Sequence, residues 1–183
     1  MSISASLNSK KGFTLIEMVI TISLIGFLLS ITATSGGSSK RQFLLTTSQE
    51  HLRALLSRAK FLSVGTTFSG SGQTVCGYGV HVDKSGGEAF IFRDLPAGFS
   101  CPGDFRYSGD TREKITGFLN VMKLDSALSF SIDADVVFIP PDPTTVLQGD
   151  AAVPEIEETI SIAGGDSRRI KINKAGLIDL ITK

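Results

Sequence analysis

The sequence predicts an α+β protein in which a long N-terminal helix packs on an antiparallel β-sheet domain. Apolar side chains between residues 13 and 62 occur first as a continuous run and then at helical spacing. Beyond Gly65 the pattern changes to alternating apolar and polar residues, which is the period of strands. Turns rich in Gly, Pro and Asp separate these strands, as is typical of an antiparallel sheet. About 120 residues remain after the first helix, enough for one small domain.

The first half of the helix is expected at residues 13–34, a run of 22 residues in which Glu17 is the only charged side chain. Such a helix is about 33 Å long, and a bilayer core is about 30 Å thick. Lys10 and Lys11 precede the run, so we expect a cytoplasmic N-terminus and an extracytoplasmic C-terminal domain. The sequence therefore predicts a single-pass protein of the inner, cytoplasmic membrane.

Residues 1–12 are expected to be a short leader. An ordinary secretory signal, which would release a secreted enzyme, is the alternative for this region. Its cleavage site would fall near Ala33, but Ile31 stands where such a site needs a small residue. The apolar run is also longer than the core of such signals, which is about 7–15 residues.

The second half of the helix, residues 35–64, is expected to be amphipathic. Gly36 and Gly37 form a weak point, since each glycine costs a helix about 1 kcal/mol relative to alanine; the sequence leaves open whether the helix continues through them. One face is apolar and the opposite face is polar. The apolar positions are Leu45, Leu52, Leu55, Leu56, Ala59 and Leu62, and the polar ones are Glu50, Arg53, Ser57 and Lys60. Gly65 is expected to cap the helix.

The β domain is expected to occupy residues 65–183. Its strands are predicted at 75–82, 89–93, 128–132, 136–139, 159–162, 169–173 and 177–181. Residues 133–135 and 140–149 are expected to be loops. Arg169 and Lys171 should share a solvent-exposed face of one strand.

Cys76 and Cys101 are the only two cysteines. In an extracytoplasmic domain oxidising conditions favour a bridge between them, and two free buried thiols are the alternative. A bridge would close a loop of about 26 residues and stabilise the domain by about 3–4 kcal/mol. A zinc site is not expected, because the cysteines lack ligand spacing and no histidine pair lies near them.

Catalysis, cofactors, metals and nucleic-acid binding are not expected. Ser57 and Lys60 match a Ser-x-x-Lys motif, but no partner motif follows and the domain is too small for that enzyme fold. The two histidines are expected to be surface or packing residues, and three loop aspartates to form a solvated acidic edge. These residues are His51, His81, Asp133, Asp135 and Asp142. The zero net charge gives no indication of a nucleic-acid partner.

The apolar run is preceded by a short motif, Lys11-Gly12-Phe13-Thr14-Leu15-Ile16-Glu17. Together, the motif and the run resemble the class III signal of type IV pilins and type II secretion pseudopilins. The resemblance implies that prepilin peptidase cleaves between Gly12 and Phe13, and that Phe13 is then N-methylated. Glu17 becomes the fifth mature residue, where it would pair with a neighbouring subunit's terminal ammonium and set the register of filament assembly.

The C-terminal region contains Gly-Tyr-Gly-Val-His-Val from Gly77, Phe-Ile-Phe-Arg-Asp from Phe90 and a late hairpin from Arg169. In these motifs and their order it is similar to the minor pseudopilin H family of type II secretion and to minor type IV pilins. The chain has neither a disulfide close to the C-terminus, as in many major pilins, nor the aromatic calcium loop of the major pseudopilin, and both absences favour a minor subunit.

The two resemblances imply a structural subunit of a pseudopilus or pilus. Its implied partners are prepilin peptidase, other pilin or pseudopilin subunits, the inner-membrane assembly platform, and membrane lipid before assembly. The alternatives are a major pilin and a membrane-anchored extracytoplasmic binding module.

Overall fold

The computed structural model describes residues 12–34, 36–66, 74–96, 98, 100–141, 144–163 and 165–181. The chain divides into two compact units, Met1–Lys40 and Arg41–Lys183. The expected leader, apart from Gly12, lies outside the described residues.

The first unit contains helix α1 (Leu15–Thr34), whose start and end agree with the expected apolar helix to within two residues. Helix α2 (Gly36–Thr66) follows, so Gly36 and Gly37 lie in its first turn. Ser35, between the two helices, is outside the described residues. Among the residues that the structure describes, neither helix has the combination of length and apolarity that a membrane crossing requires.

Helix α2 supplies the second unit with one apolar face, as predicted. Leu45, Leu52, Leu55, Leu56 and Ala59 are buried there. The predicted C-terminal cap at Gly65 is wrong, because the helix continues to Thr66. A Cβ atom at Gly65 would meet nothing within 4 Å, so this glycine lies in open space. A single glycine lowers helix stability by only about 1 kcal/mol, which does not end a helix held by packing.

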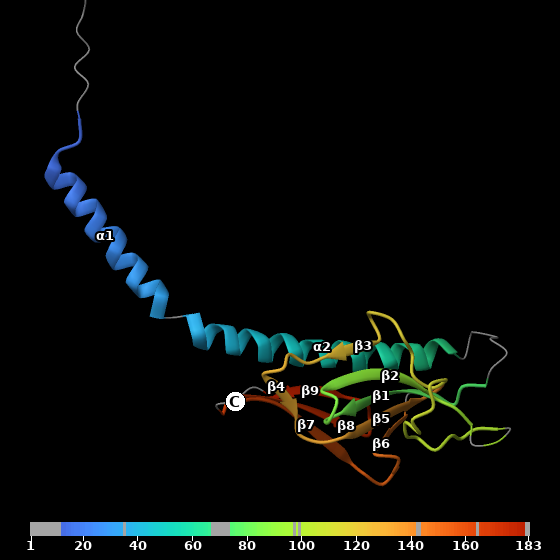
Figure 1. The fold of residues 1–183 in the computed structure, drawn as a ribbon. Helices are drawn as coiled ribbons and strands as arrows, with labels where there is room; N and C mark the ends of the chain where they lie inside the picture. The colour runs from blue at the N-terminus through green and yellow to red at the C-terminus, as the bar shows by residue number, and fades with distance from the viewer. Residues whose placement is uncertain are drawn as a thin grey trace, which may run out of the picture. The chain divides into compact units, whose positions relative to one another are not determined.

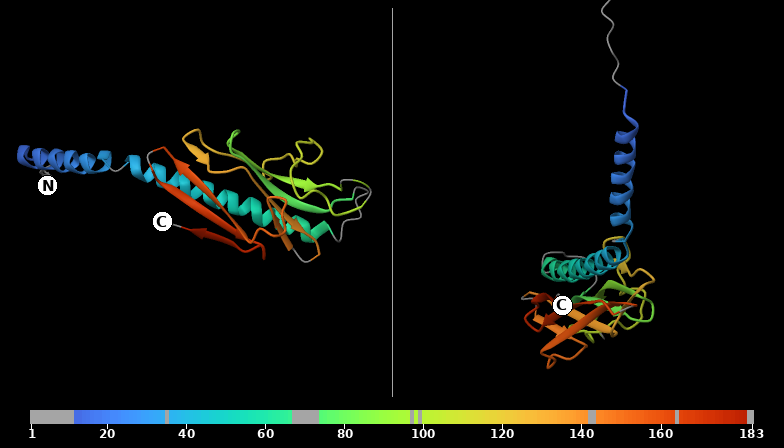
Figure 2. Two further views of the ribbon diagram at one scale, coloured as in Figure 1. Left: turned by 90° about the horizontal axis from the view of Figure 1, so that it is seen from below. Right: turned by 90° about the vertical axis from the view of Figure 1, so that its left-hand side faces the viewer.

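The strands form two antiparallel sheets against α2 (Figures 1 and 2). One sheet has five strands in the order β3-β2-β1-β5-β6. These are β1 (Gly77–Asp83), β2 (Glu88–Asp94), β3 (Val121–Lys123), β5 (Ala134–Ile139) and β6 (Thr144–Leu147). The other has four in the order β4-β7-β8-β9. These are β4 (Leu128–Phe130), β7 (Glu155–Ile162), β8 (Ser167–Asn173) and β9 (Ile178–Ile181).

Two loop predictions are partly wrong. β5 begins at Ala134, within the segment expected to be a loop, because Asp135 pairs in register with His81 of β1. β6 lies within 140–149. The prolines and Asp142 of this segment are typical of turns, so the sequence pattern did not indicate a short strand with buried Val146 and Leu147. The short strand β3, which pairs only at the edge of the five-stranded sheet, was not predicted.

The main core lies between α2 and the inner faces of both sheets. Leu52 and Leu56 of α2 join a cluster that includes Val80 and Ile91 of one sheet and Ile160 of the other. Gln49 is the buried polar exception on the helix face, and its side-chain amide donates a 2.8 Å hydrogen bond to the Arg169 carbonyl of β8. This bond fixes the helix to the four-stranded sheet without leaving a buried amide unpaired.

A second cluster lies on the opposite face of the five-stranded sheet. Phe90, Phe92 and Val137 are buried beneath Phe105 and Tyr107, which come from the segment between β2 and β3. This segment is tied to the strands by a disulfide between Cys76 and Cys101, the two cysteines that the sequence predicts to pair. Arg169 and Lys171, predicted to share one face of a strand, lie partly exposed on β8 and form ion pairs with Glu157 and Glu155 of β7.

Replacing both cysteines by serine is expected to lower the free energy of unfolding by about 3 kcal/mol. The physical reason is that the bridge joins residues 25 positions apart and so restricts the unfolded chain. Chemical denaturation followed by circular dichroism measures the change. The matched control is the native chain under reducing conditions, which should lose the same stability; a reduced chain as stable as the oxidised one would contradict the prediction.

Candidate functional site

The residues to which the pilin resemblance assigns cleavage, methylation and assembly, Gly12, Phe13 and Glu17, lie at the start of α1. Gly12, Phe13 and Thr14 precede the helix, and the backbone N–H groups of Glu17 and Met18 donate to the Thr14 carbonyl at 3.1 and 3.2 Å. The Glu17 N–H also lies 3.3 Å from the Thr14 hydroxyl oxygen. Thr14 is therefore the N-cap of α1. The Thr-x-x-Glu spacing is a capping-box signal, which could have predicted this cap from the sequence.

Glu17 lies in the first turn of α1. A carboxylate at this position is favoured by the partial positive charge of the helix N-terminus, by about 0.3–1 kcal/mol at an exposed site. Its side chain is exposed, and no described residue forms an ion pair with it. The carboxylate is therefore accessible to a positively charged group from outside the chain.

The Gly12–Phe13 junction lies outside regular secondary structure and is exposed. Phe13 is 78% exposed, and a Cβ atom built on Gly12 would meet nothing within 4 Å. Neither residue is in a helix. A peptide bond in this state can enter an enzyme's active site without prior unfolding of secondary structure.

The described surface of α1 is apolar on all sides. Its large apolar side chains are between 51% and 83% exposed. The hydroxyl groups of Thr21, Ser23 and Ser30 donate to carbonyls of their own helix, at 2.8–2.9 Å. These hydroxyls need no water, so the helix can enter apolar surroundings at low cost. A helix that is apolar all round is stable only when other helices or lipid cover it.

The Ser-x-x-Lys residues are not arranged for catalysis. The Lys60 ammonium donates to the Gly176 carbonyl at 3.1 Å, which ties α2 to the turn after β8. Ser57 and His51 are exposed on α2. The lysine is therefore engaged in a structural contact rather than placed as a base for Ser57.

His81 is a packing residue, as expected. Its Nδ1 lies 2.8 Å from an Asp135 carboxylate oxygen, and its ring packs against those of Phe90 and Tyr107, with centroids about 5 Å away. Asp135 is therefore part-buried in a strand, and its assignment to a solvated acidic edge is wrong. Asp133 accepts a 2.8 Å bond from the Lys84 N–H.

The third aspartate of the expected acidic edge, Asp142, lies outside the described residues. Within the described ranges, no group of acidic, histidine or cysteine side chains could hold a metal ion.

Asp94 is a fully buried carboxylate that sequence patterns did not reveal. It ends β2, and its Oδ1 accepts a 3.2 Å bond from the Phe105 N–H. Burial, with a smaller effect of the nearby carboxylates of Asp104 and Glu113, raises the pKa of Asp94 to about 6, although the backbone hydrogen bonds to its carboxylate act to lower it. Glu113 is also buried and accepts two 2.9 Å bonds from Ser108.

Replacing Asp94 by asparagine is expected to stabilise the second unit by up to about 3 kcal/mol above pH 6, because its pKa is raised from 3.8 to about 6 and one pKa unit corresponds to about 1.4 kcal/mol. A raised folded-state pKa means that the folded chain holds the proton more tightly than the unfolded chain. The native free energy of unfolding should therefore fall as the pH rises from about 4 to about 6, and stay lower above it.

Denaturation midpoints at several pH values test this expectation. In the asparagine variant the decrease between pH 4 and 6 that Asp94 causes should vanish. Asp179→Asn, which neutralises an exposed carboxylate, serves as the control and should leave the decrease in place. If the stability of the native chain and that of the Asp94→Asn variant changed with pH in the same way between pH 4 and 6, the prediction would be contradicted.

Comparison with known protein families gives a match that covers the junction at Gly12–Phe13 and most of α1. Residues 7–33 match the family model described as the prokaryotic N-terminal methylation motif. This match indicates a type IV pilin-like or pseudopilin protein, and a structural subunit rather than an enzyme. It implies processing by prepilin peptidase, assembly with other pilin subunits, and a membrane-anchored or extracellular filament location. Comparisons with curated proteins and with solved structures found no match.

Proposed function

We propose that this chain is a minor pseudopilin, similar to the H family of type II secretion, or the equivalent minor subunit of a type IV pilus. The observation that carries the proposal is the combination at the start of α1. A methylation motif, an open Gly12–Phe13 junction and a single carboxylate at a capped helix end lie together, ahead of an otherwise apolar helix.

Processing comes first in this proposal. Before assembly, the run at residues 13–34 anchors the chain in the inner membrane, with Lys10 and Lys11 on the cytoplasmic side. Prepilin peptidase cleaves after Gly12, and Phe13 becomes an N-methylated terminus. The exposed, non-helical state of these two residues supports this step.

Assembly follows by packing of α1 helices in the filament core. The exposed apolar side chains of α1 become buried against neighbouring subunits. Because the hydroxyls of Thr21, Ser23 and Ser30 already donate to carbonyls of α1, this burial leaves none of these hydroxyl donors unpaired. Glu17 pairs with the terminal ammonium of a neighbour. A charge left alone in apolar surroundings is strongly unfavourable, so the pair selects one axial register. An inner-membrane assembly platform draws the subunits from the lipid.

The mature N-terminus tests the proposal most directly. Mass spectrometry of the membrane-extracted chain from its own cells should give a first peptide that begins at Phe13 and is one methyl group heavier than its sequence. A peptide that begins at Met1 would instead indicate a plain membrane anchor for a binding module. A start near Thr34 would indicate an ordinary secretory signal and would overturn the filament proposal.

A further inference from the structure

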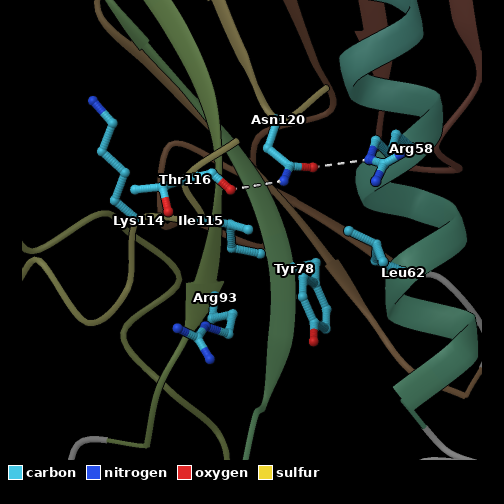
Figure 3. A pocket seen from close by; sticks show the side chains of 8 residues that line it. All are labelled: Arg58, Leu62, Tyr78, Arg93, Lys114, Ile115, Thr116 and Asn120. Atoms are coloured by element: carbon cyan, nitrogen blue, oxygen red, sulfur yellow. Dashed lines mark hydrogen bonds between the residues drawn. The ribbon is translucent and has the colours of Figure 1, made fainter. Parts of the chain in front are cut away.

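A cavity of about 410 Å³ opens between α2 and the five-stranded sheet (Figure 3). Arg58 and Leu62 line it from the helix, and Tyr78 and Arg93 from the neighbouring strands β1 and β2. The remaining wall is the segment 114–120, which leads into β3. All of these residues belong to the second unit, and none of the cavity-lining residues is acidic.

Two guanidinium groups give the cavity its charge. Arg58 Nε donates to the Asn120 side-chain oxygen at 2.9 Å, and Asn120 in turn donates to the Thr116 carbonyl at 3.1 Å, so Arg58 is held by a short chain of hydrogen bonds. Arg93 donates to the Arg112 carbonyl at 2.8 Å, while its Nε is buried with no hydrogen-bond partner. Both arginines are therefore oriented by neutral acceptors.

Neither guanidinium is neutralised within the described part of the chain, where the ion pairs involve other residues. Lys114 also lines the cavity, but its ammonium lies 2.6 Å from Glu88 and 3.9 Å from the Phe90 ring centroid. Figure 3 shows this amino group directed away from the other lining side chains. The uncompensated positive charge of the cavity therefore comes from the two arginines.

Apolar side chains form part of the cavity wall and also lie near it in the chain. Leu62, the Tyr78 ring and Ile115 contribute to the cavity wall. Phe118, in the segment between the lining residues Thr116 and Asn120, is 89% exposed, and Phe61, the neighbour of Leu62 on α2, is 74% exposed. Exposed aromatic residues beside arginines are typical of protein–protein contact sites.

We infer that this cavity binds a carboxylate side chain flanked by apolar residues in a segment of another protein. Guanidinium groups match carboxylates with paired, charge-assisted hydrogen bonds. A carboxylate would compensate the charge of these two arginines, which have no acidic partner among the described residues, whereas an uncharged ligand would not. The exposed aromatic residues around the cavity extend the contact beyond what a free small anion can cover. This inference does not depend on the proposed filament function, because none of the residues involved lies in α1.

The test uses the full chain in mild detergent and a blocked pentapeptide, acetyl-Ala-Leu-Glu-Leu-Ala-amide. The chain has two tyrosines and no tryptophan, so Tyr107→Phe leaves Tyr78 in the cavity as the single strong fluorophore. We expect a saturable change in Tyr78 emission with a dissociation constant below about 1 mM. Replacing Glu by Gln in the peptide, or Arg58→Gln in the protein, should weaken binding about tenfold or more.

The matched control is Arg53→Gln, which removes the same charge from an exposed position one and a half turns earlier on α2 and should leave binding unchanged. Arg93→Lys keeps the charge but loses the planar group, so it should weaken binding even if Arg58→Gln misfolds. Equal binding of the Glu and Gln peptides would overturn the inference. Tighter binding of free hexanoate than of the peptide would also overturn it, because it would indicate a small organic acid as the ligand.

Discussion

Replacing Glu17 by glutamine is expected to lower incorporation of the chain into filaments by at least about a hundredfold, because the neighbour's terminal ammonium would be left unpaired in apolar surroundings. Breaking a buried ion pair from one side costs about 3–5 kcal/mol. The chain itself should still fold, since the bonds from Glu17 and Met18 to Thr14 involve only backbone N–H groups. Quantification of the subunit in sheared filaments or in cross-linked oligomers measures the loss.

Glu50→Gln is the control for this experiment, because Glu50 is an exposed acid of α2 whose ion pair with Arg53 is long, at 3.7 Å. Exposed pairs of this kind contribute at most about 1 kcal/mol. Incorporation of the Glu50 variant should match that of the native chain. If the Glu17 variant entered filaments as well as the Glu50 variant, the role of Glu17 in register would be refuted.

Replacing Gly12 by leucine is expected to stop processing, so that the chain keeps its original N-terminus. The reason is steric exclusion at the peptidase, which must accommodate the residue before the cut bond. The protein's own fold does not oppose this substitution, since an added Cβ at Gly12 meets nothing within 4 Å. The mature N-terminus, read by mass spectrometry, should shift from Phe13 to Met1 in nearly all molecules.

Gly26→Leu provides the comparison for this second experiment, since an added Cβ at Gly26 of α1 also meets nothing within 4 Å. That variant should be cleaved like the native chain, because the change lies far from the junction. A Gly12 variant whose mature N-terminus is still Phe13 would contradict the prediction, because it would show that the peptidase does not require a small residue at this position.

Much of the fold could be predicted because it depends on patterns with a clear period. The buried face of α2 from Leu45 to Ala59 follows helical spacing, and Val80 and Val82 follow the alternation of a strand. The strand β6 was not predicted, because four residues between turn-forming neighbours carry too little periodicity to be distinguished from a loop.

The burial of carboxylates was not among the predictions from the sequence. Glu158 is 2% exposed in β7, where one of its oxygens accepts bonds of 2.7 and 3.0 Å from Ser131. Burial raises the pKa of Glu158, whereas these bonds lower it. Glu158 has the same parity along β7 as Ile156, Ile160 and Ile162, so alternation places it on their buried face. The sequence does not show the bonds from Ser131, 27 residues away, that make this burial possible.

The candidate assembly residues could be found from the sequence because they form one contiguous motif. The cavity of Arg58 and Arg93 could not, because its walls come from segments that are distant along the chain and meet only in the fold. Arg58 and Asn120, for example, are 62 residues apart and joined by one hydrogen bond.

The pairing of β1 with both β2 and β5 has a consequence for synthesis. The hairpin partner β2 leaves the ribosome directly after β1, but β5 begins at Ala134, after a long intervening segment. Contacts between distant segments form slowly. Part of the apolar face of α2 therefore stays exposed until the later strands have been synthesised and have packed against it. Cys76 and Cys101 bracket the β1–β2 hairpin, so oxidation can secure this early piece before the sheet is complete.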